Sequence, residues 1–281
     1  MAQQPLKTAP FEFPLEHDLT LRGEVRVSGE EGRRPVALLV HGFKGFKDWG
    51  FFPYAAEQLA RSGFAVVTFN FSCNGVGHAD FDELHKFGRN TYSREQADLT
   101  ALLERWQAGE LPLSDRMDAA RTALIGHSRG GGNSLMFAAS HPEAFQAVVS
   151  WNGIADANLF GDEFREQVLL EGIGYVENAR TKQQMPITAA FFEDLDQNRD
   201  RFDIVKAIAR LPLPVLTIQG DRDAQRLVLG QERLRQAAPH QRHLLIEGAN
   251  HTFGAIHPFA GTTPHLERAL ELTVDFLKEY R

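Results

Sequence analysis

The chain has 281 residues, of which 43% are hydrophobic and 24% charged, values typical of a globular protein rather than of a disordered, fibrous or membrane chain. Its formal net charge is -7 and it has no block of basic residues, so the clustered Lys and Arg that bind nucleic acid phosphates are missing. The single cysteine, Cys73, excludes an internal disulfide and a cysteine-based zinc site, and we expect it to be a small buried apolar residue.

The N-terminal segment MAQQPLKTAPFEFPLEHD lacks the apolar core of a secretory signal. No apolar run in the chain approaches the roughly 20 residues that are needed to cross a bilayer. We therefore expect a cytoplasmic protein that has neither a membrane nor a nucleic acid as its partner.

Along the chain, short apolar runs alternate with longer segments of helical periodicity. The first candidate strand, residues 19–28, alternates apolar and polar side chains and predicts an antiparallel hairpin at an edge of the sheet. Six further runs are continuously apolar, as is typical of strands covered on both faces in a parallel sheet. These runs are residues 34–42, 64–71, 121–127, 145–151, 213–220 and 242–248.

Helical candidates lie between these strands. Residues 53–63 begin with proline and end with glycine, the usual asymmetry of a helix. Residues 93–109 have Ser93 as a candidate N-cap and Gln96 three positions later, which is the spacing of a capping box. Segments 231–238 and 264–280 also have helical spacing. The alternation predicts an α/β fold with a mostly parallel, doubly wound sheet of about eight strands and helices on both faces.

Residues 152–211 interrupt this alternation, because they contain no convincing buried strand. Sixty residues are too many for a plain connection between two strands. We therefore interpret residues 1–281 as one α/β domain with a cap or lid inserted at about 152–211, over one edge of the sheet. The alternative is a helical excursion that takes no part in substrate binding.

Ser128 lies in a G-x-S-x-G motif within the stretch ALIGHSRGGG. The motif follows a candidate strand and opens a candidate helix, which is the context of a nucleophile elbow. Capping of the helix would also suit a serine, but it explains neither Gly126 nor the glycines at 130–132. Those glycines would each cost roughly 1 kcal/mol in a free helix, so close approach to other backbone is the expected reason for them. The pattern favours Ser128 as a nucleophile.

A serine nucleophile needs a base, and the base needs an acid to orient it. In a doubly wound sheet such residues gather at the carboxyl ends of the strands. His251, shortly after the last strand, is favoured as the base over His257, which lies farther along the loop. After the preceding strand, Asp223 is favoured over Asp221, because it has cleared the turn; Asp156 is a lesser rival.

The tetrahedral intermediate of acyl transfer also needs hydrogen-bond donors for its oxyanion. The backbone N–H of Arg129, directly after the serine, is the first candidate. The second is the N–H of Phe43, in the glycine-containing loop after an early strand. We interpret His41 as a structural histidine that fixes this loop. Aromatic residues expected as possible linings of an apolar acyl pocket are Phe43, Phe46, Trp49, Phe51, Tyr175, Phe191 and Phe192.

With these pieces in order, the sequence resembles the α/β-hydrolase superfamily over nearly its whole length. The matching motifs are HGFKG, GHSRGG, GDRD and GANH. It is similar in particular to bacterial serine esterases of the cinnamoyl and feruloyl esterase type and to dienelactone hydrolase-like proteins. The resemblance implies Ser128 as nucleophile, Asp223 as acid, His251 as base, and oxyanion donors at Phe43 and Arg129. A serine stands where dienelactone hydrolases have cysteine, and where dehalogenases and epoxide hydrolases have aspartate.

We therefore expect a serine hydrolase that acts on small-molecule carboxylic esters, with aromatic or short acyl groups, through an acyl-enzyme. This chemistry requires no metal and no organic cofactor. A thioesterase or small-peptide hydrolase with the same triad is the main alternative. A non-catalytic ligand-binding protein of the same fold is a further alternative, although pure binding does not need all three residues of the triad.

Overall fold

The computed structural model describes residues 5–29 and 32–280. Within them the main sheet has eight strands in the order β1-β2-β4-β3-β5-β6-β9-β10. Strands β1 and β2 run antiparallel to their neighbours, and the pairs from β4 to β10 are parallel. The strands are β1 Leu6–Pro14, β2 Thr20–Ser28, β3 Arg34–Val40, β4 Ala65–Asn70, β5 Met117–His127, β6 Ala147–Trp151, β9 Val215–Gly220 and β10 Arg242–Ile246. The prediction of a mostly parallel α/β sheet is confirmed.

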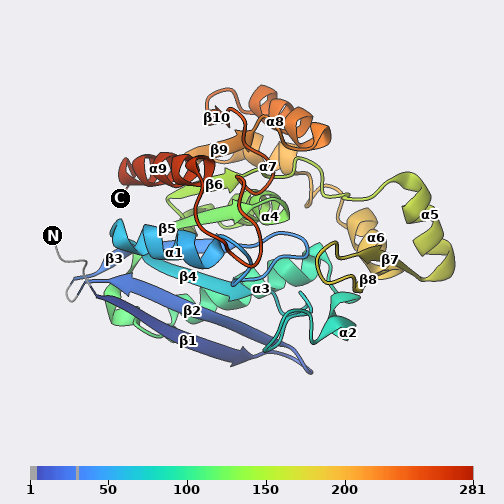
Figure 1. Cartoon of the computed structure of the whole chain (residues 1–281), viewed down its shortest axis with the longest axis horizontal. Coiled ribbons are helices and arrows are strands. Elements are labelled where there is room, and N and C mark those ends of the chain that lie inside the picture. The colour runs from blue at the N-terminus through green and yellow to red at the C-terminus, as the bar shows by residue number, and fades with distance from the viewer. Residues whose placement is uncertain (1–4, 30–31, 281) are drawn as a thin grey trace.

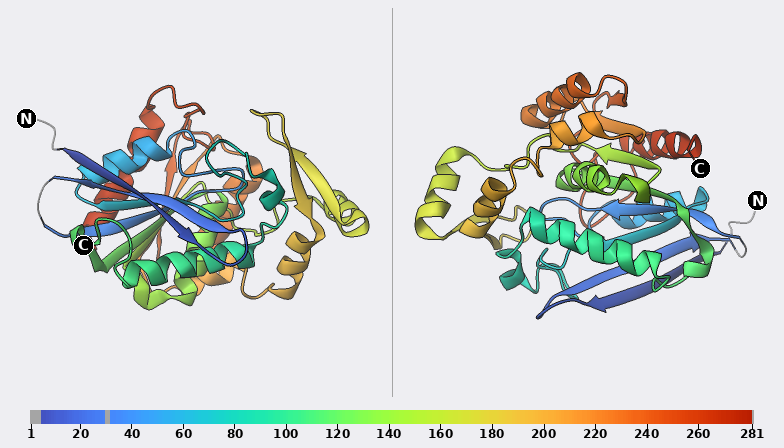
Figure 2. Two further views of the ribbon diagram at one scale, coloured as in Figure 1. Left: turned by 90° about the horizontal axis from the view of Figure 1, so that it is seen from below. Right: turned by 180° about the vertical axis from the view of Figure 1, so that it is seen from behind.

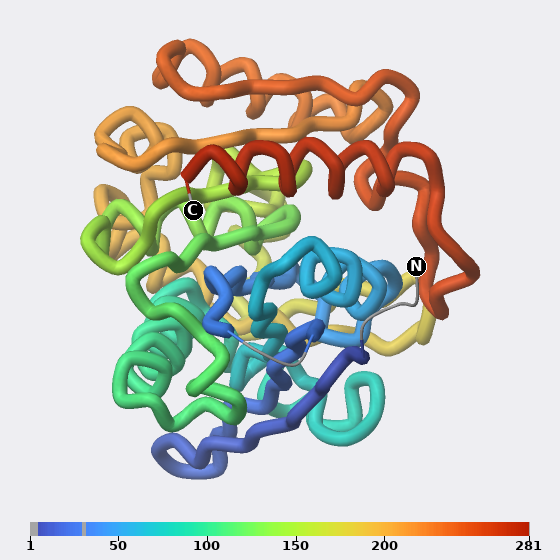
Figure 3. Tube along the Cα trace, turned by 90° about the vertical axis from the view of Figure 1, so that its left-hand side faces the viewer, coloured from blue at the N-terminus to red at the C-terminus, as the bar shows by residue number. Residues whose placement is uncertain are grey.

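Helices cover both faces of this sheet (Figure 1). On one face, side chains of α1 and α9 pack against alternate residues of the central strands. On the other face, α3, α4, α7 and α8 pack against the remaining alternate residues. The helices are α1 Phe52–Arg61, α2 Leu84–Phe87, α3 Tyr92–Gln107, α4 Arg129–Ser140, α5 Asp162–Glu171, α6 Ala189–Gln197, α7 Ile204–Arg210, α8 Gln225–Ala237 and α9 Pro264–Lys278. The start of β1 and the end of α9 lie on the side of the molecule that faces the viewer in Figure 3.

The N-terminal edge of the sheet is an antiparallel hairpin, as predicted from residues 19–28. Its outer strand, β1, precedes these residues, and the sequence did not indicate it. Pro10 and Pro14 stand within β1, and proline is tolerated in an edge strand because its missing N–H is not needed there. Prolines also weaken the sequence pattern of a strand, which explains why β1 was missed. The first four residues of the N-terminal segment considered above lie outside the described residues.

Ser93, the predicted N-cap of the helix at residues 93–109, does not cap it. Helix α3 begins at Tyr92, and its N-cap is Thr91, whose side chain accepts a hydrogen bond from the N–H of Arg94. Ser93 instead binds Asp194 of α6 through its N–H, at 2.9 Å, and its hydroxyl. The serine therefore connects α3 to the segment between β6 and β9 rather than capping its own helix.

The segment between β6 and β9 contains α5, α6, α7 and a hairpin of β7 Ile173–Glu177 and β8 Gln184–Thr188. In both views of Figure 2 its α5 and hairpin project from one end of the sheet. Its last helix, α7, packs against α4 with Ile204, Ala207 and Ile208 buried. In the described ranges, no helix combines the length and apolar character that a membrane span requires.

Candidate active site

Ser128 occupies the turn between β5 and α4 in a backbone conformation that L-residues rarely adopt. Its φ is 57° and its ψ is -122°. Such a conformation costs on the order of 1–3 kcal/mol and persists only where the surrounding structure imposes it. Here the serine N–H donates to Trp151 O, and the serine carbonyl accepts from the N–H groups of Gly131 and Ile154. The turn is therefore fixed from both sides.

The glycines around the serine permit this turn because no Cβ would fit. A Cβ on Gly126 would lie 2.1 Å from the carbonyl oxygen of Gly130. A Cβ on Gly130 would lie 2.2 Å from the carbonyl oxygen of Val40. Strand β5, helix α4 and the end of β3 thus approach each other at backbone distance. The expected close approach is the reason for at least these two glycines.

Ser128, His251 and Asp223 are joined by hydrogen bonds. The Ser128 Oγ lies 2.9 Å from His251 Nε2, and His251 Nδ1 lies 2.8 Å from Asp223 Oδ2. Burial alone would raise the pKa of Asp223, but hydrogen bonds from His251, Gln219 and the Ala224 N–H outweigh it and lower that pKa below its ordinary value. Asp223 is therefore a carboxylate at neutral pH and can accept the Nδ1–H of the histidine.

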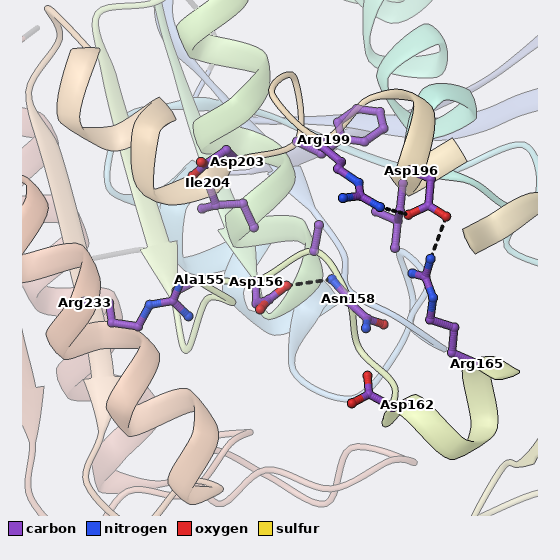
Figure 4. A pocket seen from close by; sticks show the side chains of 13 residues that line it. Ala155, Asp156, Asn158, Asp162, Arg165, Asp196, Arg199, Asp203, Ile204 and Arg233 are labelled. Carbon is purple, nitrogen blue, oxygen red and sulfur yellow. Dashed lines mark hydrogen bonds and ion pairs between the residues drawn. The ribbon is translucent and has the colours of Figure 1, made fainter. Parts of the chain in front are cut away.

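The rival residues have other partners. Asp221 accepts a hydrogen bond from the Gly248 N–H at 2.7 Å, which ties the loop after β10 to the end of β9. His257 accepts from the Gly50 N–H at 2.7 Å, and its Nε2 lies 3.2 Å from Asp80 Oδ2. Asp156 Oδ1 accepts a hydrogen bond from the Asn158 N–H within the same turn. The residue lines a cavity of about 400 Å³ that contains none of Ser128, Asp223 and His251 (Figure 4).

Sequence reasoning did not identify the residues that hold the histidine loop. His127 Nε2 donates to the carbonyl oxygen of His251 at 2.7 Å, and Asn152 Nδ2 donates to the same oxygen at 2.9 Å. Burial, and secondarily the nearby His251, lower the pKa of His127 to about 3, so it stays neutral. Gln219 Nε2 donates to Asp223 Oδ2 at 3.0 Å. Each of these side chains lies at or next to the end of a strand, so the edge of the sheet that carries Ser128, Asp223 and His251 also carries the groups that hold them.

The loop after β3 lies directly against the elbow. A Cβ placed on Gly42 would lie 3.0 Å from the Cβ of Ser128 and 3.4 Å from the backbone nitrogen of Arg129. His41 holds this loop: Nδ1 donates to the Gly42 carbonyl at 3.0 Å, and Nε2 accepts from the Phe71 N–H at 3.2 Å. Burial lowers the pKa of His41 to about 4, which keeps it neutral. These contacts agree with a structural role for His41.

The side chain of Arg129 points away from the elbow into the protein. It is 1% exposed, and its Nε donates to Glu95 Oε2 at 3.0 Å. Its guanidinium lies 4.2 Å from the ring centroid of Tyr92. Only the backbone of Arg129 is therefore available beside Ser128. Cys73 is buried, and burial raises the pKa of its thiol to about 11, which agrees with its interpretation as an inert residue.

A cavity of about 400 Å³ opens beside Ser128 and His251. Of the aromatic residues expected to line it, Phe43 and Trp49 do so. Phe46 and Phe51 are instead buried in the core beneath the loop. The apolar lining residues that the sequence did not indicate are Phe52, Phe81, Ala255 and Ile256.

The aromatics of the segment between β6 and β9 are placed differently from the prediction. Phe191 and Phe192 are buried against Phe160, in the same cluster as the core on that face of the sheet. Tyr175 faces a separate cavity near α2. What reaches the cavity is the turn of the β7–β8 hairpin, residues 178–180. Sequence periodicity could not identify this turn, because its position depends on packing between distant segments.

The sheet order, the elbow after β5 and the strand-end positions of Asp223 and His251 define an α/β-hydrolase fold. Est1E from Butyrivibrio proteoclasticus with ferulic acid bound is 17% identical, with a TM-score of 0.71 over 96% of this chain and 98% of that one. The alpha/beta hydrolase GrgF from Penicillium sp. sh18 is 18% identical, with a TM-score of 0.72 over 98% and 99%. The dienelactone hydrolase from Anabaena variabilis is 19% identical, with a TM-score of 0.56 over 96% and 98%.

The family of the chain follows from its sequence rather than from these structural similarities. The family described as "Putative esterase" matches residues 23–271, and the chain belongs to it. In Pseudomonas putida, the dihydrolipoyllysine-residue acetyltransferase component of an acetoin cleaving system is 28% identical over 211 residues. These residues are 72% of this chain and 50% of that protein, so the chain spans about half the length of this relative. Membership of an esterase family supports ester hydrolysis as the activity.

Proposed function

We propose that the protein is a serine hydrolase that cleaves carboxylic esters through an acyl-enzyme. The observation that carries this proposal is the continuous path from Ser128 Oγ through His251 to Asp223, with separations of 2.9 and 2.8 Å. A serine hydroxyl is a weak nucleophile at neutral pH, and a base within hydrogen-bond reach activates it. A carboxylate on the far nitrogen holds the imidazole in the tautomer whose Nε2 can accept the serine proton.

In the first half-reaction, His251 Nε2 takes the hydroxyl proton of Ser128 as Oγ attacks the ester carbonyl carbon. The new C–O bond pushes the carbonyl electron pair onto oxygen, and Asp223 stabilises the imidazolium. When the intermediate collapses, the bond to the alkoxy group breaks and His251 gives its proton to the departing alcohol. In the second half-reaction His251 takes a proton from water as the water oxygen attacks the acyl-serine. The bond to Ser128 Oγ then breaks, His251 gives its proton to Oγ, and the acid leaves.

The backbone N–H groups of Phe43 and Arg129 are the proposed donors to the oxyanion. Arg129 is the first residue of α4, so its N–H has no partner within the helix and lies at the positive end of the helix dipole. The Gly42 contacts with Ser128 and Arg129 support a second donor from the adjoining Phe43. In other acyl-transfer enzymes, losing one such donor costs roughly 2.7–4 kcal/mol in the transition state.

The cavity favours an ester with an aromatic or short acyl group. Its volume of about 400 Å³ and its aromatic wall of Phe43, Trp49, Phe52 and Phe81 suit one ring or a short chain. We propose that residues 152–211 act as a cap, since their hairpin turn forms part of the cavity wall and contacts the loop after β3 through Lys44. The ferulic acid bound to the structurally similar Est1E is consistent with an aromatic substrate.

The test is labelling by a fluorophosphonate probe together with hydrolysis of short p-nitrophenyl esters. We expect Ser128→Ala to abolish labelling and to lower kcat by at least about 10⁴-fold. Ser140→Ala, at the other end of α4, is the matched control and should behave as wild type. Equal labelling of wild type and Ser128→Ala would exclude Ser128 as the nucleophile. Turnover of matched thioesters or peptides in preference to esters would support the thioesterase or peptidase alternative, and saturable binding without turnover would support a binding protein.

A further inference from the structure

The charge of the cavity beside Ser128 differs from that of the chain as a whole. The chain has 37 acidic and 30 basic residues. Among the described residues, however, those that line the cavity include Lys44, Arg180 and three histidines but no Asp or Glu. Among the described residues of this acidic protein, the wall beside Ser128 thus carries basic groups without a carboxylate. Such a wall favours a ligand that carries a negative charge.

Two of the basic groups in this wall already have a partner. Arg180 Nη2 lies 2.6 Å from Asp80 Oδ2, and His257 Nε2 lies 3.2 Å from the same oxygen. Asp80 therefore neutralises the charge on this side of the cavity. Arg180 cannot receive an anionic ligand without losing its ion pair, and His257 Nε2 cannot do so without losing its hydrogen bond to Asp80.

Lys44 is different, because no carboxylate in the described ranges lies within ion-pairing distance of it. Its Nζ donates to the backbone carbonyl of Glu177 at 3.2 Å and lies 5.6 Å from the ring centroid of Phe43. The carboxylate of Glu177 is paired with Lys182 at 3.0 Å. Partial burial lowers the pKa of Lys44, an effect that exceeds the opposing influence of Glu177. A carboxylate bound beside Nζ would oppose this effect and favour the ammonium form.

The backbone of Lys44 is also unusual. Its φ is 56°, in the left-handed region where glycine or asparagine is the less strained choice. The residue directly follows Phe43, the proposed oxyanion donor. A long cationic side chain at a strained position, next to the reacting centre, is more readily explained by a role in the site than by the needs of the turn.

Asn178 adds a second donor beside Lys44. It follows Glu177, whose carbonyl binds the lysine, and it lines the same cavity. Its Oδ1 accepts from the N–H groups of Arg180 and Thr181, at 3.1 and 3.3 Å, so the side chain is anchored by its oxygen. No acceptor for its Nδ2 is found among the residues that the structure describes. An ammonium and an amide N–H₂ in the wall of one cavity are suited to the two oxygens of a carboxylate.

We propose that Lys44 and Asn178 form a subsite for a carboxylate on the substrate, so that the preferred esters are half-esters of dicarboxylic acids. This inference rests on the proposed function, because it specifies which ester Ser128 attacks. The loop after β3 supplies the lysine and the hairpin turn supplies the asparagine. The subsite therefore spans the boundary between the sheet and the proposed cap.

The experiment compares two esters of equal chain length that differ only in charge. Monoethyl adipate carries a carboxylate where ethyl hexanoate carries a methyl group, and both can be followed by acid release. The measured quantity is the ratio of kcat/KM for the charged ester to kcat/KM for the neutral ester. We expect Lys44→Met to lower this ratio by about 10- to 100-fold, the range for losing one charge-assisted hydrogen bond.

Matched variants separate recognition from a merely structural role. Lys47→Met removes a nearby lysine that pairs with Asp48 and does not line the cavity, and it should keep the wild-type ratio. Lys44→Arg keeps the charge and should retain most of the preference, whereas Asn178→Leu should lower the ratio by less than Lys44→Met. If Lys44→Met changed kcat/KM of both esters by the same factor, the lysine would serve only to hold the hairpin turn, and the subsite would be excluded.

Binding without turnover distinguishes failure of the subsite from failure of the proposed function. Calorimetry would measure monoethyl adipate binding to Ser128→Ala and to the double variant with Lys44→Met. Weaker binding to the double variant supports the subsite even if wild type hydrolyses neither ester. Equal binding to both proteins overturns the subsite, even if Ser128 is confirmed as a nucleophile by its probe.

Discussion

Replacing Asp223 with Asn removes one negative charge and one acceptor from the site without changing the size of the side chain. In the structure both carboxylate oxygens only accept hydrogen bonds. Oδ1 accepts from the Ala224 N–H at 2.7 Å, and Oδ2 accepts from Gln219 Nε2 and His251 Nδ1. An asparagine can offer an oxygen to only one of these two sides, so its N–H₂ group must face a donor.

If the asparagine oxygen stays on the Ala224 N–H, its amide faces His251 and favours the tautomer with the proton on Nε2. That nitrogen can then no longer accept the proton of Ser128. We expect kcat for short p-nitrophenyl esters to fall by about 10³- to 10⁴-fold, which corresponds to about 4–5.5 kcal/mol of transition-state stabilisation. Stopped-flow or steady-state assays at neutral pH would measure kcat of Asp223→Asn and of wild type. Urea unfolding would show that the variant is folded.

Asp221→Asn is the matched control for this experiment. Its oxygen can still accept from the Gly248 N–H, so we expect kcat to change by less than about threefold, the scale of a surface substitution. A loss at Asp223→Asn of less than tenfold, or a larger loss at Asp221→Asn, would refute the assignment of the orienting acid.

Two further predictions concern stability. Burial keeps His41 neutral in the folded protein, with a pKa of about 4 against an ordinary value of 6.5; the unfolded chain therefore binds the extra proton between these values, and stability rises with pH across this window. His41→Gln should reduce the slope of unfolding free energy against pH there by at most about 1.4 kcal/mol per pH unit, with the largest effect near the middle of the window. Urea unfolding from pH 4.5 to 6.5 would measure this slope. An unchanged slope would show that the folded protein does not lower the pKa of this histidine. Gly126→Ala should lower the unfolding free energy by about 1–3 kcal/mol, because its Cβ would meet backbone at 2.1 Å, whereas Gly161→Ala, with nothing within 4 Å, should change it little. Equal Tm values for the two glycine variants would contradict the close approach at the elbow.

Much of the sheet could be predicted because buried parallel strands carry a strong local signal. The runs at 34–42 and 64–71 are continuously apolar and contain β3 and β4, and the run at 121–127 lies within β5. Ser128, Asp223 and His251 could be proposed because parallel strands end at the same edge, so residues after different strands become neighbours. Their hydrogen-bonded arrangement follows that expectation, while their catalytic roles stay predictions until the variants above are measured.

Other features of the site depend on contacts that a local pattern does not contain. Asn152 holds the carbonyl of His251 across about a hundred positions in the chain, and nothing near it in sequence indicates that role. Lys44 looks like any surface lysine until the hairpin turn with Asn178 is placed against it. Phe46 and Phe51 follow the loop motif closely, yet packing turns both into the core. The partners and burial of these side chains are set by tertiary packing and not by the local sequence.

The order of the strands has a consequence for how the protein matures. Ser128 and His251 are 123 residues apart in the chain, and His251 is carried by the loop that leaves β10, the last strand of the sheet. During synthesis the nucleophile elbow can form long before its base has left the ribosome, and long-range parallel pairing is slow to complete. A chain that has folded only as far as β9 therefore has a strained serine and no means of activating it. If Ser128 and His251 act as proposed, esterase activity is a late event, and its recovery during refolding reports the docking of the final strand rather than the collapse of the core.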